Sequence, residues 1–522
     1  MTPAGPPPFR NEPYTDFSQP VAREAMRAAL AGVAGRLGQT YRPWIGGRFR
    51  ETDGTFDSFN PSRPSQLIGR HGKGSAADAH EAVEAAFAAY PAWSRTPSEE
   101  RVRLLLRCVE ILKRRKLEFN AWLVLEAGKS WMEAEADTSE AIDFCGYYAR
   151  LMLRHASPEP LLQMPGERGH LRYLPLGVGI IIPPWNFPLA ILAGMSAAAL
   201  VAGNTVVIKP SSDTPTIAAM FVEVLAEAGF PGGAYQFLPG PGAAVGDTLV
   251  THPRTRFISF TGSKAVGLRI NQLAAQSAPG QIWIKRVIAE MGGKNAIIAD
   301  AGADLDAAAS GILASAFGYQ GQKCSACSRA IADERVYDAL LDRLAAGAAR
   351  LTVGPADDPS YDMGPVINAQ AKRTILGYIE QGKKEGRLIA GGSAVPGLDG
   401  HFIQPTIIAD AGPGAVIFRE EIFGPVLAVT RARDFDHALT LANDTEYGLT
   451  GAVYASDPAL LRRAEDEFFA GNLYLNRKCT GAMTGCHPFG GFNMSGTDSK
   501  AGGPDYLLQY MQAKCIAERL PV

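Results

Sequence analysis

The sequence is poor in cysteine and has no excess of charge of one sign. Seven cysteines occur among 522 residues, and an odd, scattered set of this kind is typical of reduced thiols rather than of a disulfide scaffold. The formal net charge is −2, so nothing in the overall balance attracts nucleic acid or an anionic membrane surface. These absences predict a cytoplasmic protein whose partners are small molecules or further copies of the chain.

Segments that would direct the chain into or across a membrane are also lacking. The first residues, MTPAGPPPFRNEP, are rich in proline and contain no apolar run, so we do not expect a secretory signal. Residues 173–208 carry no charged side chain over a length that suggests a membrane span, but Pro183, Pro184 and Pro188 interrupt them. We therefore predict no membrane span and interpret the run as buried strand, turn and helix.

A chain of this length exceeds one ordinary domain core, and its pattern predicts two α/β domains. From residue 174 short apolar strands alternate with helices, and the second half repeats the alternation from residue 295. Such alternation is typical of doubly wound parallel sheets, which bind ligands at the carboxyl ends of their strands. Helices are predicted over residues 18–38, 76–89, 98–126, 214–228, 305–317 and 336–350.

The usual dinucleotide-binding fingerprint is missing. GPGAAVG at residues 240–246 has one residue too many before its last glycine, which makes it a weak match. FTGSKAVG, which begins at Phe260 near the end of a predicted strand, is a second candidate, because glycines at a helix start admit a phosphate. We expect a nucleotide to be held in an unusual way.

Three motifs together predict a covalent mechanism of aldehyde oxidation. PPWNFP presents the Asn186 amide between prolines, EMGGKN places Glu290 before a glycine pair, and GQKCSACSR contains Cys324. A thiolate that adds to an aldehyde carbon makes a tetrahedral alkoxide, which can lose hydride to a nicotinamide. The Asn186 amide and the Cys324 backbone N–H would stabilise the alkoxide. Glu290 would activate the water that cleaves the resulting thioester.

The Cys-x-x-Cys spacing of Cys324 and Cys327 leaves other interpretations open. It suits a redox disulfide or half of a metal site as well as a single nucleophile beside a bystander. A zinc site would combine this pair with Cys486 and His487, although no second closely spaced pair has finger-like spacing. We favour the single nucleophile and predict no metal. We also predict that oxidants close a 324–327 disulfide, since a nucleophile of low pKa invites oxidation.

The order of these motifs resembles the aldehyde dehydrogenase family. FNPSRP, PPWNFP, VVIKP, FTGS, EMGGK, GQKCS, EEIFGPV and PFGGFNMSG follow one another over about residues 40 to 500. The resemblance implies NAD as cofactor, Cys324 as nucleophile, Asn186 as oxyanion donor and Glu290 as base. Lys209 and Glu421 would hold the cofactor riboses. The full set that it implies around the cofactor is Pro184, Trp185, Lys209, Ser212, Gly242, Phe260, Thr261, Gly262, Ser263, Gly292, Glu421 and Phe423.

The same resemblance implies a fold of three parts. A Rossmann-like NAD-binding domain would span residues 1–155 and 177–290, and an α/β catalytic domain residues 291–499. A β-flap would span residues 156–176 and 500–522. The flap would join two subunits into a homodimer, with dimers assembled into a hexamer as the larger alternative.

A narrower resemblance concerns the substrate. FRNEP, EAIDF, FGYQGQKCSACSR, NLYLNRKCTGA and KAGGPDYL resemble the Δ1-pyrroline-5-carboxylate dehydrogenases within this family. The resemblance implies oxidation of L-glutamate γ-semialdehyde to L-glutamate, the last step of proline breakdown, with proline dehydrogenase as a partner that supplies the substrate. Another small aldehyde is the alternative substrate. The residues implied around the substrate are Glu140, Phe187, Ser325, Gly481, Ala482 and Phe489.

One position departs from the family pattern. The family commonly has a glutamate three residues after the cofactor lysine, where it hydrogen-bonds the adenosine ribose, and here Ser212 stands at that position. Loss of the carboxylate removes repulsion against a 2′-phosphate. We therefore predict that NADP is tolerated better than by relatives that carry the acid.

Overall fold

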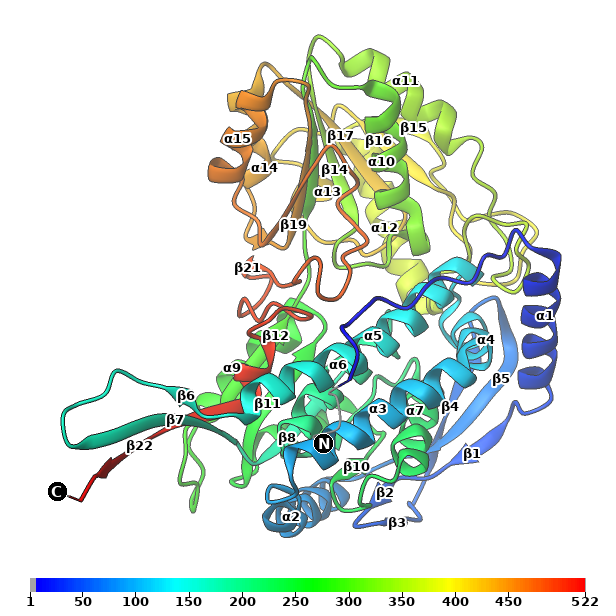
Figure 1. Ribbon diagram of the computed structural model, residues 1–522. Helices are drawn as coiled ribbons and strands as arrows, with labels where there is room; N and C mark the ends of the chain where they lie inside the picture. The colour runs from blue at the N-terminus through cyan, green and yellow to red at the C-terminus, as the bar shows by residue number, and fades with distance from the viewer. Residues whose placement is uncertain (1–5, 522) are drawn as a thin grey trace.

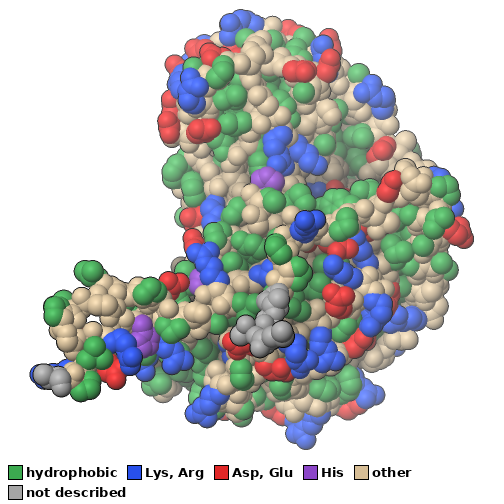
Figure 2. All heavy atoms as spheres, viewed as in Figure 1, with side chains coloured by type: hydrophobic (Ala, Val, Ile, Leu, Met, Phe, Trp, Pro, Cys, Tyr) green, Lys and Arg blue, Asp and Glu red, His purple; other side chains and the backbone are tan. Residues whose placement is uncertain are grey.

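The structure is a computed structural model that describes residues 6–521. Two α/β lobes lie one above the other in Figure 1, and a long arm projects from the lower lobe. The lower lobe contains most of the first half of the chain, and the upper lobe contains most of the second half. Charged side chains of both signs are interspersed over the face seen in Figure 2, in keeping with the small net charge.

The lower lobe is built on a seven-stranded sheet in the order β12-β11-β8-β9-β10-β2-β3. The first five of these strands run parallel, and β2 and β3 are antiparallel additions at one edge. β8 and β9 are nearly continuous apolar runs, as expected for parallel strands covered on both faces. The strands span Trp44–Ile45 (β2), Arg48–Phe49 (β3), Val178–Ile182 (β8), Thr205–Ile208 (β9), Tyr235–Phe237 (β10), Thr255–Thr261 (β11) and Arg286–Glu290 (β12).

Helices of the lower lobe pack on this sheet and on one another. The helix predicted over residues 98–126 is two helices, because the backbone leaves helical geometry at Arg115. The helix predicted over residues 18–38 ends four residues early, at Ala34. The helices span Pro20–Ala34 (α1), Ala76–Trp93 (α2), Ser98–Arg114 (α3), Lys116–Ala127 (α4), Trp131–Ala156 (α5), Ala190–Val201 (α6), Pro215–Ala228 (α7), Gly242–Gly246 (η1), Asp247–Thr251 (α8) and Lys264–Ala275 (α9).

The upper lobe is built on a second seven-stranded sheet in the order β15-β16-β17-β14-β13-β19-β20. All of its strands are parallel except β15 at the edge. Its strands span Asn295–Ala299 (β13), Cys327–Asp333 (β14), Arg387–Ala390 (β15), Thr406–Ala409 (β16), Val426–Ala432 (β17), Thr450–Tyr454 (β19) and Asn472–Leu475 (β20). Its helices span Leu305–Phe317 (α10), Gly318–Gly321 (η2), Tyr337–Ala348 (α11), Ala369–Glu385 (α12), Val416–Arg419 (α13), Phe435–Asn443 (α14) and Pro458–Glu467 (α15). The predicted division at residue 290 falls between β12 and β13, which belong to different sheets.

The arm is a three-stranded antiparallel sheet of Glu159–Pro160 (β6), Glu167–Pro175 (β7) and Met511–Arg519 (β22). The predicted start of the second flap segment, residue 500, is therefore too early, because β22 begins only at Met511. Tyr506–Tyr510 (η3) instead packs into the core of the lower lobe, because Tyr506, Leu507 and Tyr510 are buried there. Smaller sheets pair Gln39–Tyr41 (β1) and Thr55–Asn60 (β4) with Arg63–Gly72 (β5), and Tyr447–Gly448 (β18) with Phe492–Asn493 (β21).

The charge-free run at residues 173–208 contains the end of β7, then β8, α6 and β9. Buried packing in the lower lobe explains its apolar character, since α6 is buried along nearly its whole length. Within residues 6–521 no helix has the length and apolarity needed to cross a membrane. The first five residues of the proline-rich start lie outside the described part of the chain.

Candidate active site

The carboxyl ends of the parallel strands in the lower lobe carry many of the predicted site residues. Asn186 follows β8, Lys209 follows β9, Ser263 follows β11, and Glu290 is the last residue of β12. In the upper lobe, Cys324 precedes β14 and Glu421 precedes β17, so both lie at the opposite, amino end of their sheet. Two hydrogen bonds between the lobes, from Asn186 to the Gln322 carbonyl and from the Gly293 N–H to Glu421, bring these two edges together.

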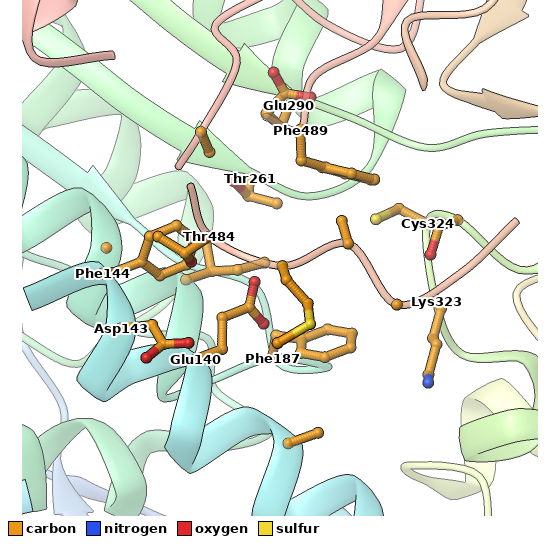
Figure 3. Close-up of a pocket in the computed structure, with 18 of the residues that line it drawn as sticks. Glu140, Asp143, Phe144, Phe187, Thr261, Glu290, Lys323, Cys324, Thr484 and Phe489 are labelled. Atoms are coloured by element: carbon orange, nitrogen blue, oxygen red, sulfur yellow. The ribbon is translucent and has the colours of Figure 1, made fainter. Parts of the chain in front are cut away.

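A cavity of about 160 Å³ lies where the two edges meet. Figure 3 shows Glu290 and Cys324 on one side of it, with Glu140 and Asp143 on the side of α5. The cavity thus collects a thiol, a carboxylate and a loop around residue 481. Predicted residues that line it are Glu140, Phe187, Thr261, Glu290, Cys324, Ser325, Gly481, Ala482 and Phe489.

Cys324 is held by a loop of unusual backbone geometry. Tyr319, Gln320 and Gly321 have φ values of 50°, 56° and 68°, a run of left-handed residues that turns the chain sharply before the thiol. The Asn295 amide donates a hydrogen bond to the Cys324 carbonyl at 2.7 Å. Burial, together with the carboxylates of Glu421 and Glu290, raises the pKa of the Cys324 thiol to about 12. The expectation of a low pKa is therefore wrong for this state of the protein.

Asn186 lies in the turn between β8 and α6, and only 4% of its surface is exposed. Its Nδ2 donates to the carbonyl oxygen of Gln322 at 3.0 Å. The amide is therefore directed at the loop that carries Cys324, two residues before the thiol. It does not line the cavity in this state.

Glu290 is a half-buried carboxylate that faces the cavity. Its Oε1 accepts a hydrogen bond from the Ser499 hydroxyl at 2.5 Å, and its Oε2 accepts one from the Gly491 N–H at 3.3 Å. Burial raises the pKa of Glu290 to about 7, while these hydrogen bonds act in the opposite direction. A carboxylate with this pKa exchanges protons near neutral pH, which a general base requires.

Lys209 and Glu421 are two buried groups that a nucleotide can engage. The Lys209 Nζ donates to the Pro210 carbonyl at 3.3 Å, and no carboxylate within residues 6–521 pairs with it. Burial lowers the pKa of Lys209 to about 8. Glu421 accepts from the Gly293 N–H at 3.0 Å, and burial raises the pKa of its carboxyl. A Cβ atom at position 292 would lie 2.1 Å from the Glu421 Oε2. Any residue other than glycine would therefore displace this carboxylate.

The other residues predicted around the cofactor fall into three groups. Trp185 and Phe423 touch edge to face with ring centroids 5.4 Å apart, next to the buried Pro184. Ser212 and Gly242 are exposed near the carboxyl ends of β9 and β10. Ser263 begins α9, where its side chain accepts from the Val266 N–H, and a helix start of this kind can receive a phosphate.

Phe260 and Thr261 differ from the prediction that both contact the cofactor. The Phe260 ring is buried in a core cluster of the lower lobe, beneath the turn at Gly262. A Cβ at Gly262 would lie 2.6 Å from this ring, so the glycine permits the close packing. Thr261 faces the catalytic cavity instead, because alternate residues of a strand point to opposite sides.

The loop from Arg477 to His487 provides the wall opposite α5. Gly481 adopts a φ of +79°, a conformation that L-residues rarely adopt. The carbonyl oxygen of Ser325 accepts hydrogen bonds from Thr450 Oγ1 and Cys479 Sγ, so this loop and the loop of Cys324 are tied together. Glu140, on α5, is a buried acid whose pKa burial raises to about 8, with further contributions from Asp137 and Asp143.

Cys327 is separated from Cys324 by the start of β14. It is 1% exposed and lies in the core of the upper lobe, where its Sγ donates to the Arg329 carbonyl at 3.4 Å. The thiol that shares this environment is Cys479, not Cys324. Both this placement and the high pKa of Cys324 count against the predicted 324–327 disulfide.

A zinc site made of Cys324, Cys327, Cys486 and His487 is also not assembled. Cys324 lines the cavity, Cys327 is in the core, and Cys486 is exposed. His487 accepts from the Met483 N–H at 3.2 Å and lies within its own loop. This zinc-binding alternative therefore has no geometric support.

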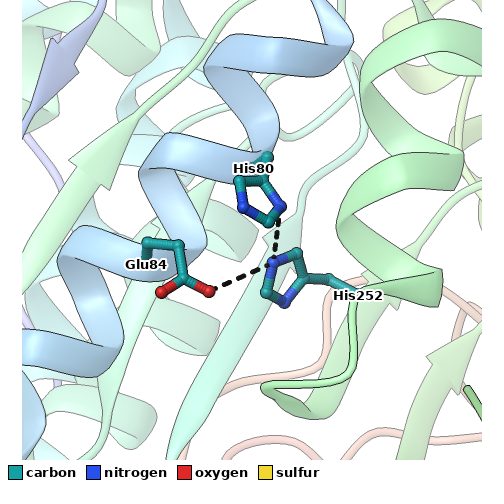
Figure 4. Close-up of side chains that lie close together, drawn as sticks. All are labelled: His80, Glu84 and His252. Carbon is teal, nitrogen blue, oxygen red and sulfur yellow. Dashed lines mark hydrogen bonds and ion pairs between the residues drawn. The ribbon is translucent and has the colours of Figure 1, made fainter. Parts of the chain in front are cut away.

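A different cluster does bring metal-ligand types together, within residues 6–521, at His80, Glu84 and His252 (Figure 4). The Arg254 N–H donates to His252 Nδ1 at 3.1 Å, so the neutral ring carries its proton on Nε2 and donates it to His80 Nδ1 at 3.0 Å. A metal on Nε2 requires the opposite tautomer, with Nδ1 as the donor. Glu84 is already paired with Arg254. The cluster is a hydrogen-bonded link between α2 and the segment before β11.

Several cavity residues were missed by sequence reasoning. Lys323 forms an ion pair with Glu133 at 2.7 Å, and both line the cavity beside Tyr14 and Asp143. Lys323 directly precedes the nucleophile in the chain, and Asp143 lies one helical turn from Glu140, so these neighbours offered a local signal. Tyr14 directly follows the motif FRNEP, which offered a local signal, although the other residues that line the cavity lie more than a hundred positions away in the chain.

Comparisons with known proteins agree on one family. The model of the aldehyde dehydrogenase family matches residues 49–516. The 1-pyrroline-5-carboxylate dehydrogenase of Geobacillus kaustophilus is 56% identical over 511 residues, which are 98% of this chain and 99% of that protein. The crystal structure of 1-pyrroline-5-carboxylate dehydrogenase from Thermus with bound NAD has a TM-score of 0.97 and 49% identity, and the match covers 100% of both chains. Proline utilization A from Bdellovibrio bacteriovorus matches with a TM-score of 0.97 and 47% identity over 99% of this chain and 54% of its own. The chain belongs to the aldehyde dehydrogenase family.

Proposed function

We propose that this chain oxidises L-glutamate γ-semialdehyde, the open form of Δ1-pyrroline-5-carboxylate, to L-glutamate with NAD, in the breakdown of proline. The observation that carries the proposal is a single cavity lined by the Cys324 thiol, the Glu290 carboxylate and the backbone of Gly481 and Ala482. Nearly full-length similarity to proteins named 1-pyrroline-5-carboxylate dehydrogenase supports the same substrate.

Cys324 is the nucleophile. Its thiol is protonated at neutral pH, since its pKa is near 12, so the proton leaves as sulfur attacks the aldehyde carbon. Glu290 lines the same cavity and is available to accept it. The carbonyl oxygen becomes an alkoxide, which the Asn186 amide and the Cys324 N–H stabilise once Asn186 exchanges its Gln322 partner for the substrate.

Glu290 first gives the proton from Cys324 to solvent, and its carboxylate then acts as general base for the thioester. Its carboxylate takes a proton from a water molecule, which attacks the thioester carbon and releases the acid and the Cys324 thiol. Ser499 and Gly491 orient the carboxylate through its two oxygens. The pKa near 7 means that the base is half ionised at about neutral pH.

The chain fits a nicotinamide cofactor. The buried Lys209 ammonium, whose one hydrogen bond goes to a backbone carbonyl, and the Glu421 carboxylate beside Gly292 suit ribose hydroxyls. Ser263 at the start of α9 suits a pyrophosphate, and the rings of Trp185 and Phe423 suit the nicotinamide. The bound cofactor supplies the acceptor for the hydride that leaves the tetrahedral carbon.

The substrate carboxylate binds at the loop that contains Gly481, Ala482 and, across the cavity, Ser325. Backbone N–H groups beside a glycine can bind an anion without a bulky cation. Phe187 and Phe489 form apolar walls, and Glu140 lies where the substrate ammonium is expected. An ammonium beside Glu140 would favour its ionised form and lower its pKa from about 8.

The arm is proposed to join two copies of the chain into a homodimer. Leu162 on the arm is 98% exposed, and Ile282 and Ile284 in the loop before β12 are 85% and 89% exposed. Apolar side chains that open to water are typical of protein contacts. Light scattering distinguishes a dimer from a hexamer built of dimers. The scarcity of cysteine supports a cytoplasmic location. The match to part of a longer proline utilization protein supports a partnership with proline dehydrogenase.

The decisive experiment is NAD reduction with Δ1-pyrroline-5-carboxylate by the wild type and by Cys324→Ala. We expect activity in the wild type and none in the variant. A panel of straight-chain and betaine-type aldehydes serves as comparison. No activity with pyrroline-5-carboxylate, or higher kcat/KM with another aldehyde, overturns the substrate assignment.

A further inference from the structure

The chain before the family domain forms part of the catalytic cavity. The family domain begins at residue 49, whereas Tyr14 lines the cavity. Residues 9–15, called here the N-terminal strap, cross α5 as the dark blue segment in Figure 1. Half of the Tyr14 surface is open to solvent, which places this side chain at the mouth of the cavity.

The strap is bound to α5 by buried carboxylates. Both oxygens of Asp143 are used: Oδ1 accepts from the Glu12 N–H at 2.7 Å, and Oδ2 accepts from the Asn11 amide at 2.8 Å. Glu135, which is fully buried, accepts from the Thr15 N–H at 2.7 Å. Hydrogen bonds to an ionised acceptor are stronger than neutral ones, so these contacts give the strap a defined position.

The same strap holds the loop that forms the substrate-binding wall. The Asn11 amide, besides its bond to Asp143, donates to the Thr484 carbonyl at 3.0 Å. Phe9 stacks edge to face on Tyr147, with centroids 5.1 Å apart, and lies against Gly485. Asn11 therefore connects α5 directly to the loop that carries Gly481 and Ala482.

Thr484 links this contact to a ligand. Its side chain lines the cavity and is 4% exposed, and its Oγ1 has no hydrogen-bond partner within residues 6–521. A buried hydroxyl without a partner is costly unless a ligand or water satisfies it. Tyr14 adds a second hydroxyl on the α5 side, near Glu140 and Asp143. Burial and these carboxylates raise the pKa of Tyr14 to about 12, so its hydroxyl remains a hydrogen-bond donor at neutral pH.

We propose that the N-terminal strap is a substrate-selecting element: Asn11 positions the Thr484 hydroxyl, and Tyr14 closes the mouth of the cavity, for a substrate with an amino-acid head group. This inference rests on the proposed function, because it assigns the strap to recognition of the amino and carboxylate groups of glutamate semialdehyde. The hydrogen bonds of the strap go to α4, α5 and the loop of residues 484–486, and none goes to Cys324, Glu290 or Asn186. Asn11 is therefore a positioning residue, and the chemical step does not depend on it.

The test compares two substrates in Asn11→Ala, Tyr14→Phe and the wild type. Loss of one hydrogen bond of this kind is worth about tenfold in binding, so we expect Asn11→Ala to raise KM for glutamate semialdehyde about tenfold and to change kcat less than about twofold. The ratio of kcat/KM for glutamate semialdehyde over propionaldehyde falls by the same factor. Tyr14→Phe removes only a hydroxyl and lowers this ratio about threefold to tenfold.

Gln19→Ala is the matched control, because the Gln19 side chain donates only to exposed Asp16, just before α1. The substrate ratio of this variant is expected to match that of the wild type. Thermal melts identify a variant that has lost its fold. If Asn11→Ala does not fold, Tyr14→Phe, which keeps its ring, decides whether the proposal holds. Unchanged ratios in both strap variants overturn the proposal. An equal loss with both substrates, or a loss confined to kcat, overturns it as well. A wild type that does not oxidise glutamate semialdehyde contradicts the proposed function instead.

Discussion

The two ends of the catalytic cavity are built differently. At the reacting end, Glu290 is the last residue of β12, and Cys324 and Asn186 lie in short turns close to strands of the two sheets. At the selecting end, Gly481 and Thr484 belong to a loop, and this loop is held by a strap from outside the family domain. Strand ends fix a side chain more rigidly than loops do. The chemical step therefore depends on the two sheets. The choice of substrate depends on the loop and the strap, which can vary in sequence without disturbing the sheets.

The largest effect is expected at the nucleophile. Cys324→Ala should lower kcat with glutamate semialdehyde more than about a thousandfold, because no other thiol lines the cavity. Cys327→Ala, in the core of the upper lobe, should stay within about twofold of the wild type. Steady-state NAD reduction measures both. A Cys324→Ala enzyme that keeps a tenth of the activity would show that the reacting end is misassigned.

Glu290→Gln should slow thioester hydrolysis by about a hundredfold to ten-thousandfold, and it should also slow the initial burst of cofactor reduction, because Glu290 accepts a proton in both steps. The pKa of Glu290 is raised to about 7, so its carboxylate is protonated below that pH and ionised above it. We therefore expect kcat of the wild type to rise with pH through about 7, and the glutamine variant to lose this rise. Stopped-flow traces and a pH profile test both points; a wild-type rate that falls with pH in this range contradicts the role.

Gly481→Ala probes the selecting end. The φ of +79° is strained for alanine, and the added Cβ lies 3.3 Å from the Lys478 side chain. We expect the loop to shift, KM for glutamate semialdehyde to rise about tenfold, and kcat to fall less than about threefold. Steady-state kinetics separates the two constants. If kcat falls as far as KM rises, the two ends are not independent.

Ser212→Glu should have a smaller effect, on the cofactor alone. The added carboxylate repels a 2′-phosphate, so kcat/KM with NADP should fall about fivefold relative to NAD. Ser212→Gln provides a control of the same size without charge. The two cofactors are compared at saturating substrate. An unchanged preference in the glutamate variant removes the argument for NADP tolerance.

The smallest difference is expected in oxidation by peroxide. Because Cys327 lies in the core beside Cys479 and the pKa of Cys324 is high, no 324–327 disulfide is expected. Wild type and Cys327→Ala should lose activity to peroxide at the same rate and regain it to the same extent with a thiol reductant. Recovery that is confined to the wild type would restore the disulfide hypothesis.

Much of the fold followed from local pattern. The helix predicted over residues 305–317 has the same limits in the structure, and β8, α6 and β9 occupy the charge-free run. Local pattern failed where a tertiary contact decides. Arg115 lies in a continuous helical pattern, yet the backbone breaks there and its guanidinium donates to Glu223 on α7 at 3.4 Å. The tail from residue 500 looks like one segment, yet its first part is buried in the lower lobe.

By itself the sequence determined the alternation of strands and helices and singled out the candidate catalytic residues, because both depend on short stretches of neighbouring residues. It also placed Cys324, Glu290 and Asn186 in three short motifs. Only the tertiary structure decided that the carboxyl edge of one sheet meets the amino edge of the other, that burial raises the pKa of Cys324, and that Asn11 reaches Thr484 across 473 positions. The physical reason is that burial, and the pKa shifts that follow from it, depend on how distant segments pack together.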